Sequence, residues 1–178
     1  MVIETLVRAA NKDAIADAAA KTDRAFKAGA IAVGASCEIT TMPGYLPALS
    51  EKADASVLAA AEIAAQTSEK DYQIVQEDTH AYSGGSTDVG DVQHLQPVLT
   101  FNTGGKVSGL HSVDFDIVDE ELAYVVTAKI FALSAYRLLR DGAVKAKEIV
   151  ANYQPIFTKE EYIKYMDSFI KTETISVR

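Results

Sequence analysis

The chain has 178 residues, of which 48% are hydrophobic and 24% are charged, and its formal net charge is −8. This composition is typical of a folded globular protein with one ordinary domain or two small lobes, and it excludes a disordered chain. The acidic balance argues against a nucleic-acid surface, because phosphate binding needs clustered Lys and Arg. Cys37 is the only cysteine, which excludes a disulfide framework and a cysteine metal cluster.

Targeting signals are also missing from the sequence. The first 20 residues lack the basic-then-apolar pattern of a signal peptide, and no apolar run approaches the roughly 18 residues needed to span a bilayer. We therefore expect a cytoplasmic protein with neither a membrane nor a nucleic acid as its partner.

The N-terminal region predicts a strand followed by a long helix. Val2 to Arg8 alternates in polarity and is rich in β-branched residues, which is typical of a strand with one face in water. Asn11 is the predicted N-cap of a helix that continues to about Val33 at helical spacing. Gly34 then supplies the left-handed residue that ends many helices.

A second strand is predicted over Cys37 to Met42 and ends at the segment Pro43-Gly44-Tyr45-Leu46-Pro47. Strand, helix and strand together form a compact unit that looks like half of a small sandwich. The segment after the second strand has two interpretations, a hinge between lobes or a rigid surface turn, and the sequence leaves both open.

The central region predicts a helix and a short strand. Ser50 can cap a helix that runs to about Gln66, and its many alanines indicate close packing against a neighbour. Tyr72 to Val75 is expected to form a short strand.

The stretch from Gly84 to His111 concentrates glycines, acids and an isolated histidine. Ser86 or Thr87 can cap a short helical turn, and Pro97 to Phe101 predicts a short buried strand. The glycine-containing loop that follows delivers His111.

The C-terminal region is predominantly helical by pattern. Asp119 is the predicted cap of a helix to about Arg140, with an interruption at Asp141-Gly142 and a shorter helix beyond it. A capping box at Thr158 to Glu161 opens a last helix through about Ile170. Thr174 to Val177 can add an edge strand. Together these elements predict a mixed α/β protein.

His111 is the first candidate for chemistry, and four carboxylates lie near it in the sequence: Asp88, Asp91, Asp114 and Asp116. A two-metal hydrolytic site needs several carboxylates and imidazoles that converge on the ions. Acids in such loops also serve as turn formers and helix caps, and a histidine after a glycine loop is also found as a hydrogen-bonded surface residue. The residues alone leave these alternatives open.

Other chemical motifs are missing. His80, in a loop, and His94, at the expected end of a helical turn, are weaker candidates than His111. The sequence contains no GxxxxGK[ST] or strand-linked GxGxxG phosphate loop, no HExxH, no GxSxG and no cysteine nucleophile with a nearby histidine.

Several segments in a fixed order carry a resemblance to a known family. They are Val2 to Ala9, Arg24 to Ala30, Glu38-Ile39, Pro43 to Pro47, Ser86 to Val92, His94, Pro97, and Gly109 to Ser112 with Phe115. In order and spacing this set resembles the C-terminal part of the two-metal amidohydrolases, the group of aminoacylase-like peptidases and p-aminobenzoyl-glutamate hydrolases. The likeness extends from about residue 2 to residue 165.

The resemblance implies a fold, a reaction and a set of site residues. Residues 1–47 would form half of a lid or dimerisation lobe, and residues 48–178 the closing segment of a zinc-peptidase-like catalytic lobe. His111 would be a ligand of zinc or manganese, and Ser86, Thr87 and Asp88 would line the substrate pocket. The reaction of the family is hydrolysis of an amide bond next to a free carboxylate, by a metal-bound water with a glutamate as general base.

The sequence departs from the family in its catalytic parts. It has no HxD motif, no bridging aspartate and no preceding Glu-Glu pair, since Glu120-Glu121 and Glu160-Glu161 follow His111. One ligand remains, whereas a catalytic zinc normally takes about three from protein. We therefore expect no catalytic residue in these 178 residues, and no activity unless a separate chain supplies the missing half.

Assembly is the second expectation from this incompleteness. Half-lobes expose apolar faces, so we expect a homodimer or a larger self-assembly. The alternative function is a non-catalytic binding or oligomerisation module, because a truncated sheet leaves unpaired edges.

Overall fold

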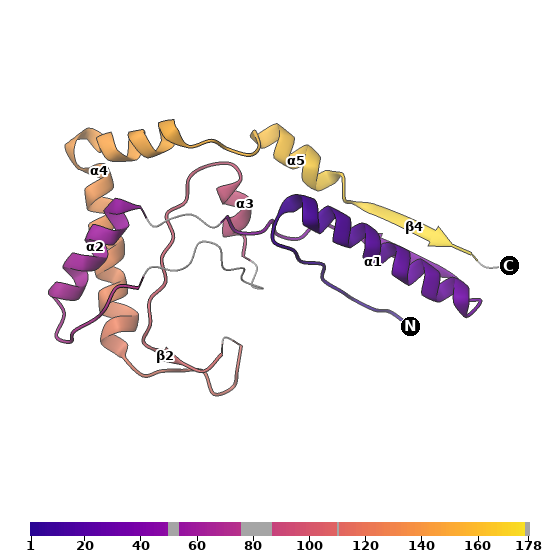
Figure 1. Ribbon diagram of the computed structural model, residues 1–178, viewed down its shortest axis with the longest axis horizontal. Coiled ribbons are helices and arrows are strands. Elements are labelled where there is room, and N and C mark those ends of the chain that lie inside the picture. The colour runs from indigo at the N-terminus through magenta and orange to yellow at the C-terminus, as the bar shows by residue number, and fades with distance from the viewer. Residues whose placement is uncertain (50–53, 76–86, 110, 177–178) are drawn as a thin grey trace. The chain divides into compact units, whose positions relative to one another are not determined.

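The computed structural model describes residues 1–49, 54–75, 87–109 and 111–176 (Figure 1). Helices hold 50% of these residues and strands 9%, so the chain is a mixed helix-and-sheet protein, as its pattern predicts. The chain divides into two compact units that interleave in sequence. Unit 1 comprises Met1–Ser50, His80–Gln96 and Gln154–Arg178, and unit 2 comprises Glu51–Thr79 and Pro97–Tyr153. The assignment of residues 1–47 and 48–178 to two lobes of a known family stays a prediction.

Unit 1 begins with the long helix α1 (Lys12–Ala32), as predicted. The Asn11 side chain accepts a hydrogen bond from the Ala14 amide, which satisfies one of the unpaired donors at the helix start. Gly34 has φ +70°, the left-handed conformation that ends the helix.

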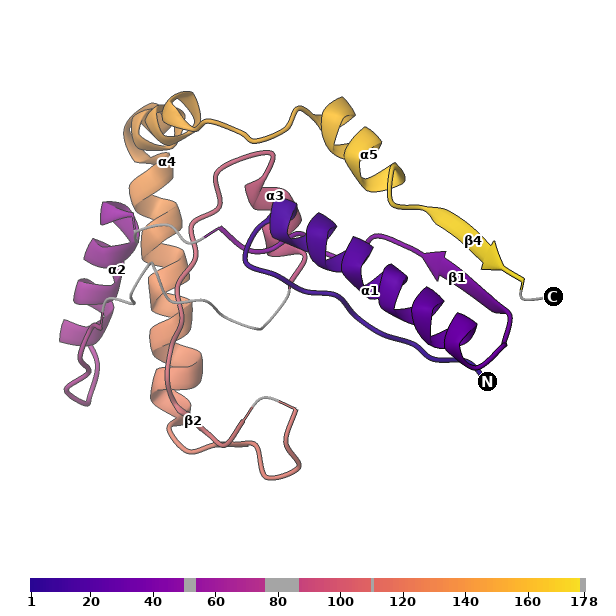
Figure 2. The same ribbon diagram turned by 45° about the vertical axis from the view of Figure 1, so that its right-hand side comes forward.

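The sheet of unit 1 joins two strands from opposite ends of the chain. β1 (Cys37–Thr41) pairs antiparallel with β4 (Lys171–Ile175), with Cys37 opposite Ile175. Helix α1 runs beside this pair in both views (Figures 1 and 2). Lys171 Nζ lies 2.9 Å from Asp23 Oδ2, and this ion pair fastens α1 to β4.

The prediction of a strand over Val2 to Arg8 is wrong. These residues form no ladder, and their apolar side chains are exposed, with 87% of Val2 and 78% of Leu6 accessible. Alternating polar and apolar residues indicate that one face of a strand could be buried. A strand also needs a neighbouring strand for its backbone hydrogen bonds. In the described residues β1 takes β4 as its partner instead.

Two short helices complete unit 1. The predicted helical turn is α3 (Val89–Gln93), and α5 (Lys159–Asp167) opens with the predicted capping box between Thr158 and Glu161. Helix α5 ends at Asp167 rather than near Ile170, because the chain then enters β4, which also begins earlier than the predicted tail strand.

The Pro43 to Pro47 segment is anchored within unit 1. Leu46 is buried, and its amide donates a 2.9 Å hydrogen bond to Asp91 Oδ1 beside α3. These contacts favour the rigid turn over the hinge.

Unit 2 is built on two helices that pack side by side (Figure 1). α2 (Ala55–Gln66) contacts the long C-terminal helix, which consists of a π-helical turn η1 (Glu121–Val126) and α4 (Thr127–Asn152). The core is Val57, Ala60, Ala64, Val126 and Ile130. Asp54, not Ser50, caps α2, since its carboxylate accepts from the Ser56 amide, and Ser50 lies outside the described residues.

Two predicted strands in unit 2 are absent from the described residues. Tyr72 to Val75 and Pro97 to Phe101 form no ladder. Leu99 and Phe101 nevertheless pack against the core, so their apolar character reflects burial against helices rather than a strand. The observed strands are the short antiparallel pair β2 (Lys106–Val107) and β3 (Asp116–Ile117).

Helix α4 bends at the predicted interruption. Arg140 to Ala143 have non-helical dihedral angles, and Asp141 and Ala143 have φ near +60°. By length and composition alone, the helical stretch Glu121–Asn152 could cross a membrane, with a mean hydropathy of 1.4 in its apolar window. Only 17% of that window is buried, with Val126 and Ile130 in the core of unit 2, and the core helix of a soluble protein also passes this test of length and composition.

Candidate functional site

His111 lies in an exposed turn between β2 and β3 in unit 2. Its φ is +68°, in the left-handed region, and its imidazole makes no hydrogen bond with any described residue. The carboxylate of Asp114 organises the turn by accepting hydrogen bonds from the Ser108 hydroxyl, at 2.6 Å, and from the Ser112 hydroxyl. These bonds, the Ser108 bond first, lower the pKa of Asp114 below its usual range.

The residues around His111 do not form a complete metal site. A catalytic zinc takes about three protein ligands, and no three His, Cys, Asp or Glu side chains among the described residues converge on one point. Asp114 is the nearest acid in this turn, and its oxygens accept from two serine hydroxyls. In this turn, the described residues therefore provide one imidazole, that of His111, as a metal ligand.

The three predicted pocket residues lie at the start of α3. Ser86 is outside the described residues. The Thr87 hydroxyl donates to Asp88 Oδ1 at 3.3 Å and accepts a long hydrogen bond from the Val89 amide. The N-cap of α3 is nevertheless Asp88, which makes no side-chain capping bond, so the prediction of a cap at Ser86 or Thr87 is wrong for Thr87. Thr87 and Asp88 belong to unit 1, and His111 belongs to unit 2.

His94 has a structural role at the end of α3. It is 1% exposed, its Nδ1 lies 2.7 Å from the Gly90 carbonyl, and its ring stacks on Phe157 at 6.0 Å. Its carbonyl accepts from the amides of Ile156 and Phe157. His94 therefore joins α3 to the segment before α5. His80, the remaining histidine, lies outside the described residues.

All four candidate carboxylates accept hydrogen bonds, Asp88 from the Thr87 hydroxyl. Asp91 accepts from the Leu46 amide, Asp114 from two serines, and Asp116 from the Ile117 amide. The contacts of Asp88, Asp114 and Asp116 are with residues near in the sequence and support the turn-forming interpretation, whereas Asp91 holds Leu46, which lies 45 residues earlier.

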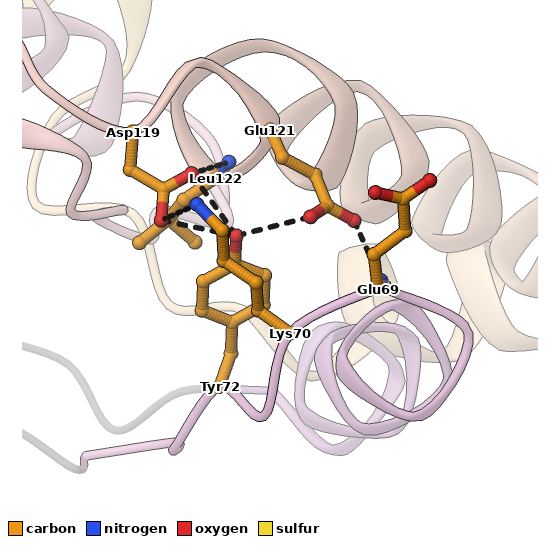
Figure 3. Close-up of polar contacts among 6 residues, drawn as sticks. All are labelled: Glu69, Lys70, Tyr72, Asp119, Glu121 and Leu122. Atoms are coloured by element: carbon orange, nitrogen blue, oxygen red, sulfur yellow. Dashed lines mark hydrogen bonds and ion pairs between the residues drawn. The ribbon is translucent and has the colours of Figure 1, made fainter.

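The most connected polar cluster in unit 2 was not predicted from the sequence (Figure 3). It joins the loop after α2 to the start of η1. Tyr72 Oη donates to Asp119 at 3.1 Å and lies 3.4 Å from Glu121 Oε2, while Lys70 Nζ lies 2.9 Å from Asp119 Oδ2. The Glu69 amide donates to Glu121 at 2.8 Å.

The cluster has one cation, Lys70, which pairs with Asp119, while Glu121 accepts from the Glu69 amide and the Tyr72 hydroxyl. The Lys70 ammonium, above all, lowers the pKa of Asp119, and the Asp119 carboxylate raises the pKa of Lys70. Desolvation first, and the bond to Asp119 second, raise the pKa of Tyr72 to about 12. Tyr72 is therefore a neutral donor over the whole physiological range.

Asp119 combines the role predicted for it with a second one. It caps the helix by accepting from the Leu122 amide at 3.1 Å, as expected, and it also binds Lys70 and Tyr72 from the other side. Both of those residues come from a segment predicted as loop and strand, so sequence spacing gave no signal of the contact. The cluster fixes the start of η1 to the loop after α2.

Comparisons with known proteins leave the family open. No family model, no curated protein and no solved structure matches the chain.

Proposed function

We propose that these 178 residues supply the C-terminal part of an amidohydrolase-type metallopeptidase. In this proposal residues 1–47 form part of a lid or dimerisation lobe, and the remainder forms the closing segment of the catalytic lobe. The parent reaction is metal-assisted hydrolysis of an amide bond in N-acyl amino acids or dipeptides, with zinc or manganese. His111 contributes one metal ligand, and Ser86, Thr87 and Asp88 contribute to the substrate pocket.

The observation that supports the incompleteness in this proposal is the apolar surface left uncovered. Among the described residues six hydrophobic residues are buried, while 26 large hydrophobic side chains are exposed. Single exposed apolar residues are ordinary, but series along one element indicate a surface that another protein segment covers. One such series lies on the N-terminal segment and the other on the C-terminal helix formed by η1 and α4. They include Val2, Ile3, Leu6, Tyr124, Val125, Phe131, Tyr136 and Leu139.

The turn that carries His111 also supports an incomplete site. Its imidazole is exposed and unpartnered among the described residues, in a left-handed conformation that non-glycine residues rarely adopt. A ligand whose companions come from another segment would be expected in such a position. The cytoplasmic location and the absence of nucleic-acid and membrane partners remain part of the proposal.

The test of inactivity is a hydrolysis assay on the purified chain. N-acyl amino acids and dipeptides are offered with added Zn²⁺ or Mn²⁺, and no turnover above the metal-only control is expected. Robust hydrolysis by the 178-residue chain would overturn the claim that another segment is required.

The test of His111 is complementation. The chain is co-expressed with a segment that carries the HxD motif, the bridging aspartate and the Glu-Glu pair of a two-metal amidohydrolase, and metal content and hydrolysis are measured. We expect bound metal and activity with the natural chain and with His80→Ala, and loss of both with His111→Ala. Metal content that is equal in the natural complex and in His111→Ala would exclude His111 as a ligand.

The second candidate is a non-catalytic binding or oligomerisation module. The two-stranded β1–β4 sheet favours it, because within the described residues neither strand has a second neighbour and both outer edges can pair with another chain. A complex that assembles fully without metal, and stays inactive under every complementation, would favour this module over the hydrolase.

A further inference from the structure

A groove of about 440 Å³ lies on unit 2 between the start of α2 and the bend of α4. Its size falls in the range of small-molecule sites. Three cations line it, namely Arg137, Arg140 and Lys145, together with two carboxylates and the apolar side chains of Ala55 and Val144. The groove contains none of the residues assigned above to the metal or to the pocket.

The cations of the groove differ in how they are neutralised. Arg140 Nε lies 3.5 Å from Asp141 Oδ2, and Lys145 Nζ lies 3.2 Å from Glu148 Oε2. Arg137 has no hydrogen bond or ion pair with any described residue, and its Nε is shielded from solvent without an acceptor. Two of the three cations therefore form ion pairs within the groove. Arg137 has no anionic partner among the described residues.

A buried donor without an acceptor is destabilising, and more so when the group is charged, so native proteins supply a partner for it. A guanidinium presents parallel N–H donors in a plane, a geometry that matches carboxylate and phosphate oxygens. The partner that Arg137 lacks is thus an oxyanion. The N-terminus of α2 is not the source of this preference for an anion, because the Asp54 carboxylate already accepts from the Ser56 amide there.

The backbone beside the groove is held in a costly conformation. Asp141 and Ala143 both have left-handed backbone, a conformation that is unfavourable for a residue with a Cβ. This bend sets the direction of the last turns of α4, from which Val144 and Lys145 enter the groove.

The geometry points to an oxyanion site in this groove. Arg137 binds a carboxylate or phosphate group of a small molecule, Arg140 and Lys145 add positive potential, and Val144 and Ala55 contact its apolar part. The inference stands apart from the proposed function, because it needs neither metal nor a second chain.

The site is tested by titrating the 178-residue chain with sodium phosphate and with sodium succinate in a calorimeter at matched ionic strength. Saturable binding of at least one anion is expected. Arg137→Gln is expected to weaken it at least about tenfold, since a hydrogen bond to a charged group is lost. Arg137→Lys keeps the charge but lacks the planar guanidinium. Its affinity for the anion should lie between those of the natural chain and Arg137→Gln. Lys164→Gln, an exposed lysine of α5, removes the same charge elsewhere and should bind like the natural chain.

Val144→Glu provides an independent check if Arg137→Gln loses helical circular dichroism. Val144 is exposed, so the variant should fold, and its new carboxylate competes for Arg137 and should abolish binding. Binding of phosphate alone or succinate alone identifies the source of the oxyanion, and each outcome supports the site. The site is overturned if neither anion binds saturably, if Arg137→Gln and Lys164→Gln weaken binding equally, or if Val144→Glu binds like the natural chain.

Discussion

Gly90 is the residue at which two segments of unit 1 approach most closely. A Cβ added there would lie 2.2 Å from the Leu46 carbonyl oxygen and 2.9 Å from the carbonyl carbon of Pro47. Backbone cannot rotate away as a side chain can, so Gly90→Ala must displace the anchored segment. We expect a loss of about 1–3 kcal/mol in the free energy of unfolding, measured by urea titration of the helical circular dichroism.

Gly29 offers the matched control, because nothing lies within 4 Å of a Cβ built there in the interior of α1. Gly29→Ala should stabilise the protein by roughly 0.5–1 kcal/mol, since alanine loses less backbone freedom in a helix. Equal stability of the two variants would contradict the close approach at Gly90.

Asp119 gives unit 2 a dependence on pH whose sign follows from its lowered pKa. Lys70 first, and then the Leu122 amide, favour the charged carboxylate in the folded state. The stabilisation is complete above the ordinary pKa of 3.8 and is lost as pH falls through the lower folded value. Asp119→Asn should therefore be less stable than the natural chain near neutral pH and should approach it in acid.

This difference is measured by urea unfolding between about pH 7 and pH 2. Asp167→Asn, an exposed acid of α5, serves as control and should follow the natural chain throughout. A stability deficit of Asp119→Asn that is the same at both ends of the range would show that the carboxylate charge does not contribute.

At the scale of the element, the bend in α4 carries strain that a single substitution can remove. Ala143 has φ +60°, which glycine adopts without the clash of a Cβ. Ala143→Gly should therefore stabilise the protein by up to about 1 kcal/mol, against the usual effect of glycine in a helix. Ala146→Gly, three residues further along the helical part of α4, should destabilise it by about 0.5–1 kcal/mol.

Opposite signs for these two variants in urea unfolding are the expected result. A loss of stability in both would mean that the bend is not left-handed at Ala143.

Helices were predictable from the sequence because their signals are local. The Asn11 cap, the Gly34 stop, the Thr158 capping box and the break at Asp141 all lie within one turn of the feature that they mark. Strands were less predictable from the sequence, because a strand forms only when another strand pairs with it. Val2 to Arg8 alternates as a strand should, yet no described segment pairs with it, while β1 takes its partner from 130 residues away.

The candidate site divides along the same line. The position of His111 in a turn after a glycine-containing loop and the short helix α3 could be predicted, since both depend on neighbouring residues. The Tyr72–Asp119 cluster and the unpaired Arg137 could not, because each depends on α2 or its following loop meeting a helix more than 40 residues later. Contacts of this range follow from packing, which pattern alone does not specify.

At the scale of the whole molecule, unit 2 leaves apolar surface uncovered. Each unit is assembled from separate stretches of chain, and unit 2 has a core of five buried residues on α2 and the C-terminal helix. The opposite side of that helix exposes Phe131 and Leu139, at 63% and 64%. At about 25 cal/mol for each Å² of apolar surface, covering such a face is a substantial gain.

We therefore expect the purified chain to self-associate, with a light-scattering mass of at least twice 19.1 kDa. Leu139→Lys places a charge on the uncovered face of α4 and should shift the mass toward one chain at equal protein concentration. Val113→Lys makes the same change at a fully exposed residue of the His111 turn and should leave the mass unaltered. A natural chain that has the mass of one copy and still unfolds cooperatively would contradict self-association, because its apolar face would then be stable in water.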